Sequence, residues 1–378
     1  MPRLIFETRT PRFLRHRNTR AKLKNDKNTT HLLSLDLGLR AYLLKRLLNT
    51  FILIIFVIAL NFIIFELMPG LQGAIVNLIS NPRGNEDPAR QQALLKLYGL
   101  CSSFVNGTCV PEPIWNRFGT YFVNMLSFRF GDSFQTGQPV LHDMIGTGKL
   151  QNTLLLLGTA TALSLLIGTL LGVLVASKRG SLLDSGWVTT SLVTFSLPTF
   201  YMGLIFILVF AQWLQWFPAG SVTPAEWALG LPPLSQQILV RLQHLFLPAL
   251  TLTLFFYGGH LLLTRATMLE ALSEDYIVTA RAKGVSQRSI LFKHALKNAA
   301  LPLVTNAALS FGSILSGAII TETVFNWDGL GLWIWNSIGW KDFPVMQAIF
   351  YIVALCVIAA NLFSDIIYGV LDPRIKYQ

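Results

Sequence analysis

The segment TLLLLGTATALSLLIGTLLGVLVAS, from Thr153 to Ser177, runs for 25 residues without a charged side chain. A helix that crosses a lipid bilayer needs about 20 apolar residues, because each residue advances the helix by only about 1.5 Å. The segment therefore predicts a transmembrane helix. One such run would also fit a buried helix of a large soluble protein, but the chain contains several.

The composition of the whole chain agrees with a membrane protein. Of its 378 residues, 52% are hydrophobic and 13% are charged, about half of the charged fraction of soluble proteins. The mean hydropathy is +0.52. We predict an all-α integral membrane protein with about six transmembrane helices. Besides Thr153–Ser177, the spans are expected at residues 47–68, about 187–214, 245–264, 301–320 and about 345–371.

The distribution of positive charge predicts the orientation of the chain. Twelve of the 30 Lys and Arg residues lie in residues 1–46, ahead of the first span. In the predicted topology, the side of the membrane that holds both termini carries 22 of these residues, and the opposite side carries 8. Because Lys and Arg concentrate on the cytoplasmic side, both termini are predicted to be cytoplasmic. The basic tail has no nucleic-acid motif, so we expect it to associate with anionic lipid and not with nucleic acid.

This topology predicts how the chain is divided. A basic cytoplasmic tail and the first span precede a larger extracytoplasmic loop subdomain, and a permease core of five spans follows before a short cytoplasmic end. A cytoplasmic loop interrupts the core. In order, these segments are 1–46, 47–68, 69–150, 151–372 and 373–378, with the cytoplasmic loop at 265–300.

The loop subdomain contains two cysteines, Cys101 and Cys109. They lie on the oxidising side of the membrane in this topology, so a disulfide between them is one hypothesis. The other hypothesis is that both cysteines are free thiols, since the sequence does not determine the distance between them.

The sequence contains no energy-converting site of its own. The nearest approach to the phosphate-binding motif G-x-x-x-x-G-K-[ST] is at Gly148-Lys149, but Asp143 and Leu150 replace its first and last residues, which indicates a turn. No cluster has metal-ligand spacing and no residues suggest a hydrolase. His260, in the fourth span, is the one candidate proton carrier, although a packed histidine explains it more simply. We predict that the chain is not an enzyme and binds no cofactor itself.

The loop at 265–300 carries the most specific pattern. Acidic residues before Tyr276 favour a helix start, and Gly284 is suited to the left-handed conformation that ends a helix. Ser286 is then expected to cap a second short helix that includes Ile290 and Leu296. Two short helices joined at a glycine could form a knob that inserts into a partner, or a hairpin that lies on lipid.

This loop resembles the "EAA" loop of the permeases of binding-protein-dependent ABC importers, in the dipeptide and oligopeptide branch. The general pattern is E-A-A, three residues, Gly, nine residues, then I-x-L-P. The chain keeps Ala280, Gly284 and Leu296 at this spacing. It departs from the pattern in a way that is similar to the peptide branch, at Val278, Thr279, His294 and Lys297.

Further short motifs in the same order resemble this family over residues 40–378. They precede the second span, lie within the third, precede the last, and close the chain. They are Phe130-Gly131-Asp132-Ser133 with Pro139-Val140, Ser196-Leu197-Pro198-Thr199-Phe200, Glu322-Thr323-Val324-Phe325 with Gly329-Leu330-Gly331 and Asp342-Phe343-Pro344, and Leu371-Asp372-Pro373-Arg374. Asp328 stands where a proline is common.

The resemblance implies the fold of a type I importer permease in a bacterial or archaeal plasma membrane. It also implies four partners: a second and related permease, two cytoplasmic ATPases that bind ATP and Mg²⁺, and an external solute-binding protein. The cargo would be peptide, although similar permeases carry nickel, glutathione or oligosaccharides. The ATPase would dock on a coupling helix at Tyr276, Thr279, Ala280, Arg281, Lys283, Gly284 and Leu296, and Ser196, Pro198, Thr199 and Phe200 would border the translocation pathway.

Two local features add structural predictions. Gly168 and Gly172 have the spacing that permits close helix packing. Pro198 should kink or unwind the third span.

Two other classes of function stay open at this point. One is an autonomous proton-coupled carrier that uses His260. The other is a membrane-anchored scaffold or receptor whose function lies in the extracytoplasmic loop.

Overall fold

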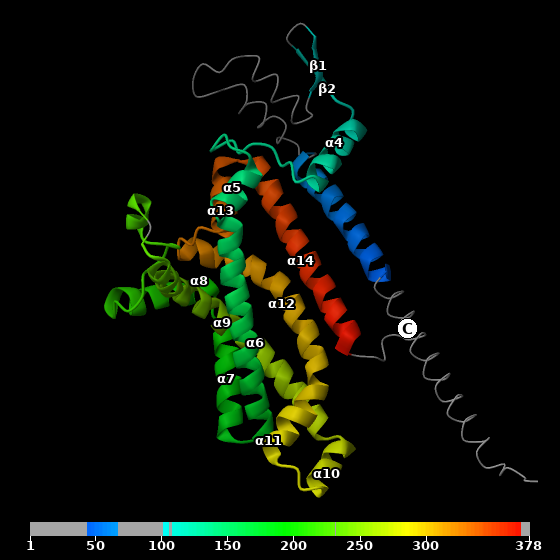
Figure 1. Ribbon diagram of the computed structural model, residues 1–378, viewed down its shortest axis with the longest axis vertical. Helices are drawn as coiled ribbons and strands as arrows, with labels where there is room; N and C mark the ends of the chain where they lie inside the picture. Colours follow the sequence, from blue (N-terminus) through cyan, green and yellow to red (C-terminus); the bar gives the residue numbers. More distant parts are fainter. Residues whose placement is uncertain (1–43, 67–100, 106–107, 231, 372–378) are drawn as a thin grey trace, which may run out of the picture.

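The computed structural model describes residues 44–66, 101–105, 108–230 and 232–371. Long helices dominate it and run between two ends of the molecule (Figure 1). Residues 1–43 of the predicted tail 1–46, residues 67–100 of the predicted loop subdomain and the predicted cytoplasmic end 373–378 lie outside the described residues. The long helices are Leu44–Glu66, α6 (Lys149–Ser177), α9 (Leu234–Leu272), α12 (Leu296–Val324) and α14 (Phe343–Leu371).

Within the described residues, four helices are long and apolar enough to cross a membrane: Leu44–Glu66, α6, α9 and α14. A fifth crossing follows if a bent helix pair counts as one span. The 29-residue helix α12 occupies the predicted position of one more span. These findings agree with an all-α membrane protein, and the count of six spans stays a prediction.

The bent pair is the predicted third span. Helix α7 (Leu182–Ser196) meets α8 (Thr199–Phe206) at an angle of 99°, and α8 continues as the π-helix η1 (Ile207–Trp213). Leu197 and Pro198, between them, both have extended backbone, with ψ of 130° and 136°. Proline lacks the N–H that a continuing helix requires. The predicted break at Pro198 is therefore confirmed.

Helices α6 and α9 pack along the predicted glycine face. A Cβ atom on Gly168 would lie 2.6 Å from the Cβ of His260, and one on Gly172 would lie 2.5 Å from the Cβ of Thr264. No side chain fits in these positions, so the two backbones meet directly. The prediction of close packing at these glycines is confirmed.

The predicted limits of two spans are too narrow. Helix α9 has 39 residues and extends well beyond the predicted 245–264, while α6 begins four residues early, at Lys149. At about 1.5 Å per residue, α9 is about 58 Å long, nearly twice the apolar thickness of a bilayer. Polar residues such as Gln236, Gln237 and Arg241 remain helical because leaving the apolar layer does not by itself end a helix.

The two ends of the bundle carry different short elements (Figure 1). The first end has an antiparallel hairpin of β1 (Cys101–Val105) and β2 (Thr108–Pro111), with α4 (Ile114–Leu126), α5 (Val140–Gly146) and α13 (Leu330–Trp340). A short 3-10 helix, η2 (Ala225–Leu229), precedes α9. The opposite end has α10 (Asp275–Ala282), α11 (Gln287–Ser289) and the π-helix η3 (Ile290–Ala295).

The hairpin pairs Phe104 with Cys109 and Cys101 with Pro111. Since the side chains of both cysteines lie outside the described set, the disulfide between them stays a prediction. The turn predicted at Gly148 is present, and Gly148 has a φ of +82° between α5 and α6.

An apolar core joins the first helix to the short elements at its end. It contains Ile58 from the first helix, Met125 from α4, Met144 from α5, Leu330 from α13 and Tyr351 from α14. This core holds the first helix beside α14, where Asn61 also donates a hydrogen bond of 3.0 Å to the carbonyl oxygen of Gln347.

Candidate functional site

The loop between α9 and α12 forms a compact projection at one end of the bundle (Figure 1). Helix α10 begins at Asp275 and ends at Ala282. Gly284 follows with a φ of +72°, and the N–H of Val285 donates a 3.2 Å hydrogen bond back to the carbonyl of Ala280. A residue with a side chain would be strained in this left-handed conformation. The predicted role of Gly284 as a helix stop is confirmed.

The second helix of the loop differs from the prediction. It is not a separate short helix, because α11, η3 and α12 follow one another without a break from Gln287 to Val324. Ser286 occupies the capping position, but its side chain makes no capping hydrogen bond. The loop is thus one short helix packed on the beginning of a long one, and any displacement of the second segment acts directly on α12.

A small apolar core fixes α10 to the bundle. Ile277 and Ala280 on α10 are buried against Ile290 and Ala295 of η3 and against Met268 of α9. Ala280 is only 7% exposed, so its small side chain permits close packing inside the loop and does not face outward. Leu296 also packs partly against this core. These two predicted docking residues therefore support the loop from within.

The remaining predicted docking residues, Tyr276, Thr279, Arg281, Lys283 and Gly284, are exposed. Two apolar side chains of the loop that the sequence did not single out for docking are exposed as well. They are Val278, with 62% of its surface exposed, and Phe292, with 45%. Val278 could have been identified from the sequence, because it stands at the position where the general loop pattern has glutamate. Exposed basic side chains lie in the same loop and at the beginning of α12, at Arg281, Lys283, Arg288, Lys293 and Lys297.

An ion pair connects the region of the loop to the bent span. Arg265, near the end of α9, donates two hydrogen bonds to the carboxylate of Asp184 on α7, at 2.7 and 2.9 Å. The backbone N–H of Gly180 donates a third, at 2.9 Å. The Asp184 side chain is only 6% exposed. Bidentate, partly buried pairs of this kind fix geometry more firmly than exposed ones do.

The predicted pathway residues lie together at the bend between α7 and α8. Ser196 ends α7 and its hydroxyl donates a 2.8 Å hydrogen bond to the carbonyl of Leu192. Pro198 directly precedes α8, Thr199 begins it, and 47% of the Phe200 surface is exposed. The structure thus groups all four residues at one break in the helix.

The candidate proton carrier His260 lies at a packed helix crossing. It is only 2% exposed, lies against Gly168, and its Nδ1 is 3.2 Å from the amide nitrogen of Asn306. This surrounding matches the simpler interpretation of a packed histidine. No group of three or more metal-ligating side chains occurs among the described residues.

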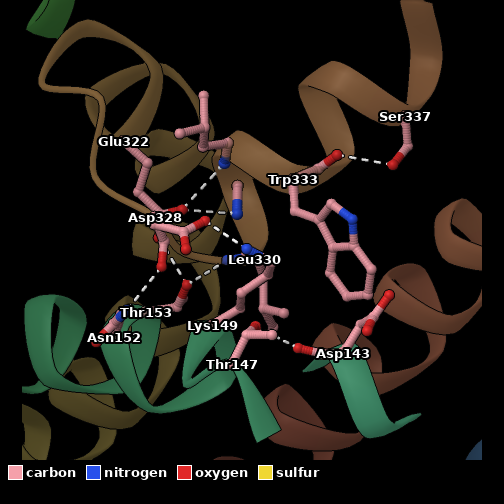
Figure 2. Close-up of polar contacts among 12 residues, drawn as sticks. Asp143, Thr147, Lys149, Asn152, Thr153, Glu322, Asp328, Leu330, Trp333 and Ser337 are labelled. Carbon is pink, nitrogen blue, oxygen red and sulfur yellow. Dashed lines mark hydrogen bonds and ion pairs between the residues drawn. The ribbon is translucent and has the colours of Figure 1, made fainter. Parts of the chain in front are cut away.

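A buried polar cluster, drawn in Figure 2, lies near the end of α12, the helix whose beginning continues from the loop. Glu322, near the end of α12, is fully buried and accepts a 2.7 Å hydrogen bond from the Thr153 hydroxyl on α6. It also accepts hydrogen bonds from the N–H groups of Gly331 and Leu332, at 2.7 and 3.1 Å. The Thr153 hydroxyl accepts one from the N–H of Leu330, at 2.7 Å. Carboxylate and hydroxyl together cap the beginning of α13.

Neighbouring contacts extend this cluster (Figure 2). A Cβ on Gly329 would lie 2.5 Å from an oxygen of Glu322, which explains why glycine occupies the position. Lys149 forms a 2.6 Å ion pair with Asp328, and Asn152 donates a 2.7 Å hydrogen bond to the Asp328 carbonyl. Three helices are therefore joined by side-chain contacts between residues far apart in the sequence.

A second carboxylate ties two loops together at the same end. Asp342 accepts hydrogen bonds from the Ser133 hydroxyl at 2.6 Å and from the N–H groups of Phe134 and Gln135 at 3.1 and 3.2 Å. The motifs singled out at 130–133 and 342–344 are thus parts of one contact. Sequence reasoning found the motifs but not their pairing.

Comparisons with known proteins identify the class of this fold and loop. Residues 168–377 match the family described as binding-protein-dependent transport system inner membrane component. The chain is 34% identical over 338 residues to an oligopeptide transport system permease protein of Bacillus subtilis, covering 89% of this chain and 99% of that protein. It is 37% identical over 278 residues to a di/tripeptide transport system permease protein of Pseudomonas aeruginosa, covering 71% and 82%. It is 33% identical over 335 residues to a dipeptide transport system permease protein of Escherichia coli, covering 85% and 95%.

The chain belongs to the family of binding-protein-dependent transport system inner membrane components. The predicted resemblance to dipeptide and oligopeptide ABC permeases is confirmed. The chain is accordingly a multi-pass inner-membrane transport subunit and not an enzyme.

Proposed function

We propose that this chain forms half of the translocation pathway of an ATP-driven importer for di- and oligopeptides. The relatives are named as permeases for oligopeptides, di- and tripeptides, and dipeptides, which supports this cargo. A second, related permease supplies the other half of the pathway, and an external binding protein delivers the peptide. Both termini lie in the cytoplasm of the bacterial or archaeal cell, as the charge distribution of 22 against 8 basic residues supports.

In this proposal, the projection formed by α10 docks in a groove of a cytoplasmic ATPase. The observation that carries the proposal is the two-faced character of α10. One face, with Ile277 and Ala280, is buried against the bundle, whereas Val278 presents an exposed apolar side chain on the other. A rigid helix with an exposed apolar face is suited to a groove with an apolar floor. The exposed Arg and Lys side chains of the same loop favour acidic groups on that groove.

The same contacts provide a route for movement into the membrane. The loop continues directly into α12, and its core includes Met268 of α9. The ion pair of Arg265 with Asp184 then couples α9 to the beginning of α7, and the other end of α7 reaches the bend at Pro198. When two ATPases close on ATP, the loops move together, and these helices tilt as one body between inward- and outward-facing states.

The test is co-purification of the assembled importer from its native membrane with the wild-type chain, Val278→Arg and Leu182→Arg. Leu182 is 93% exposed at the beginning of α7, on the same side of the bundle, so it provides a matched control. We expect Val278→Arg to release the ATPase and abolish peptide-stimulated ATP hydrolysis, while the second permease stays bound. Leu182→Arg should retain both. Retention of a fully active ATPase by Val278→Arg would refute docking at α10.

A further inference from the structure

Helix α4 carries an exposed apolar stripe along its whole length. Trp115 is 81% exposed, Val123 61% and Leu126 43%. With Gly119, where an added Cβ would meet no atom within 4 Å, these residues recur at i, i+4, i+8 and i+11, which places them on one face of the helix. Single exposed apolar side chains are ordinary on a protein surface, but a continuous stripe of them indicates a contact surface.

The other two faces of α4 have different characters. Tyr121 and Met125 belong to the apolar core that joins α4 to the first helix. Asn116 and Thr120 are exposed and form a polar face. A helix with one exposed apolar face and one exposed polar face is typical of a membrane surface, where the polar face lies in water and the apolar face enters the lipid.

The contacts of α4 determine its depth in the membrane. Arg117 forms a 2.5 Å ion pair with Glu66, the last residue of the first helix, and the rings of Phe118 and Phe62 lie 5.2 Å apart. The 19 residues between Arg46 and Glu66 carry no charge. At about 1.5 Å per residue they extend for about 29 Å, close to the roughly 30 Å of the apolar layer. Glu66 therefore lies at the membrane boundary, and so does α4.

The surroundings of α4 favour lipid as the partner of its apolar stripe. In the last turns of the first helix, Leu60 and Ile63 are 44% and 55% exposed, as expected for a span that faces acyl chains. In the proposed function, the second permease completes the pathway at the bend beside Pro198. Figure 1 shows the first helix and α4 across the bundle from α8, which begins at this bend. The binding protein approaches from the water, toward the polar face.

We propose that α4 is an interfacial anchor that lies on the outer leaflet of the membrane. Trp115, Val123 and Leu126 enter the boundary between headgroups and acyl chains, to a depth of about 5–10 Å. Tryptophan suits this position because its ring is largely apolar while its N–H can donate a hydrogen bond to a headgroup. The hairpin of β1 and β2 directly precedes α4, so the anchor fixes the height of the hairpin above the leaflet.

Electron paramagnetic resonance of nitroxide labels on α4 tests the proposal in the assembled importer in nanodiscs. The label is attached through a ketone-bearing phenylalanine analogue, so the three native cysteines stay in place. It replaces Trp115 or Val123 on the apolar stripe, and Asn116 or Thr120 on the polar face as matched controls. Molecular oxygen concentrates in lipid, whereas a nickel chelate stays in water. We expect labels on the stripe to collide mainly with oxygen and the controls mainly with the chelate.

Each other outcome overturns the proposal. If labels at 115 and 123 collide mainly with the nickel chelate, the stripe faces water. If they collide with neither reagent, another protein covers the stripe, and repeating the measurement without the binding protein shows whether that protein or the second permease does so. The result depends neither on the cargo nor on ATPase docking at α10, so this proposal can fail while the proposed function holds.

The native tryptophan provides a second measurement that requires no label. Lipids brominated on their acyl chains quench tryptophan emission on contact. Trp115→Phe removes one exposed ring and leaves the buried face of α4 unchanged. The part of the emission that brominated lipid quenches should be smaller in this variant than in the wild-type importer. An equal quenched emission in both would place Trp115 outside the acyl chains and overturn the proposal.

Discussion

The polar cluster around Glu322 predicts a specific cost for one conservative substitution, Thr153→Val. The two side chains have nearly the same shape, so packing within α6 is preserved. The hydroxyl, however, both donates to Glu322 and accepts from the N–H of Leu330, each over 2.7 Å. The substitution removes both hydrogen bonds at a site that is 3% exposed.

The magnitude follows from the groups left behind. The buried N–H of Leu330 loses its partner, which costs about 1–3 kcal/mol. Glu322 loses one of three donors but keeps the N–H groups of Gly331 and Leu332, so its further cost is about 1 kcal/mol. We expect a loss of about 3 kcal/mol in the free energy of unfolding. The amino end of α13 should also become less ordered.

The assay is thermal unfolding of the purified importer in nanodiscs, with Thr161→Val as the matched control. Thr161 lies on the same helix, and its hydroxyl has no hydrogen-bond partner among the described residues. The identical chemical change should there alter stability by no more than about 0.5 kcal/mol. A clearly lower transition temperature for Thr153→Val alone would support the reasoning. Equal transition temperatures for the two variants would refute it.

Three other substitutions test the contacts between helices. Gly172→Ala places a methyl group 2.5 Å from Thr264 and should cost about 1–3 kcal/mol, whereas Gly158→Ala, with open space around it, should be neutral or stabilising in the same thermal assay. Asp184→Asn weakens the bidentate ion pair with Arg265 and should lower the amount of peptide taken up per ATP hydrolysed in proteoliposomes. ATPase binding in co-purification should not change. An unchanged ratio of uptake to ATP hydrolysis would exclude a role of this ion pair in transmitting movement between the helices. Pro198→Ala allows α7 to extend into the bend and should reduce uptake in the same vesicles, so normal transport and coupling would contradict a role for the break.

Local features of the fold could be predicted because neighbouring residues determine them. Pro198 lacks an N–H, Gly284 tolerates a positive φ, and Gly168 and Gly172 leave room for a second backbone. Each of these constraints acts within a few residues of its position. The structure agrees with the prediction at all four sites.

The remaining features depend on contacts that the sequence does not reveal. Glu322 and Thr153 are 169 residues apart, and only the packing of α12 beside α6 brings them together. The inward orientation of Ala280 depends in the same way on η3. Ser286 matches a capping residue by type, but the long helix that follows does not use its side chain. The predicted limits of α6 and α9 are too narrow because polar residues at the end of an apolar run can remain helical.

The most direct test of the central claim is site-specific photo-crosslinking of the loop in the native membrane. A photoreactive phenylalanine analogue would replace Val278 in one strain and Leu182 in another. Docking of α10 predicts an adduct with a cytoplasmic ATPase from position 278 and none from position 182. An adduct from position 278 with lipid alone, in membranes where the importer is assembled and active, would contradict the account.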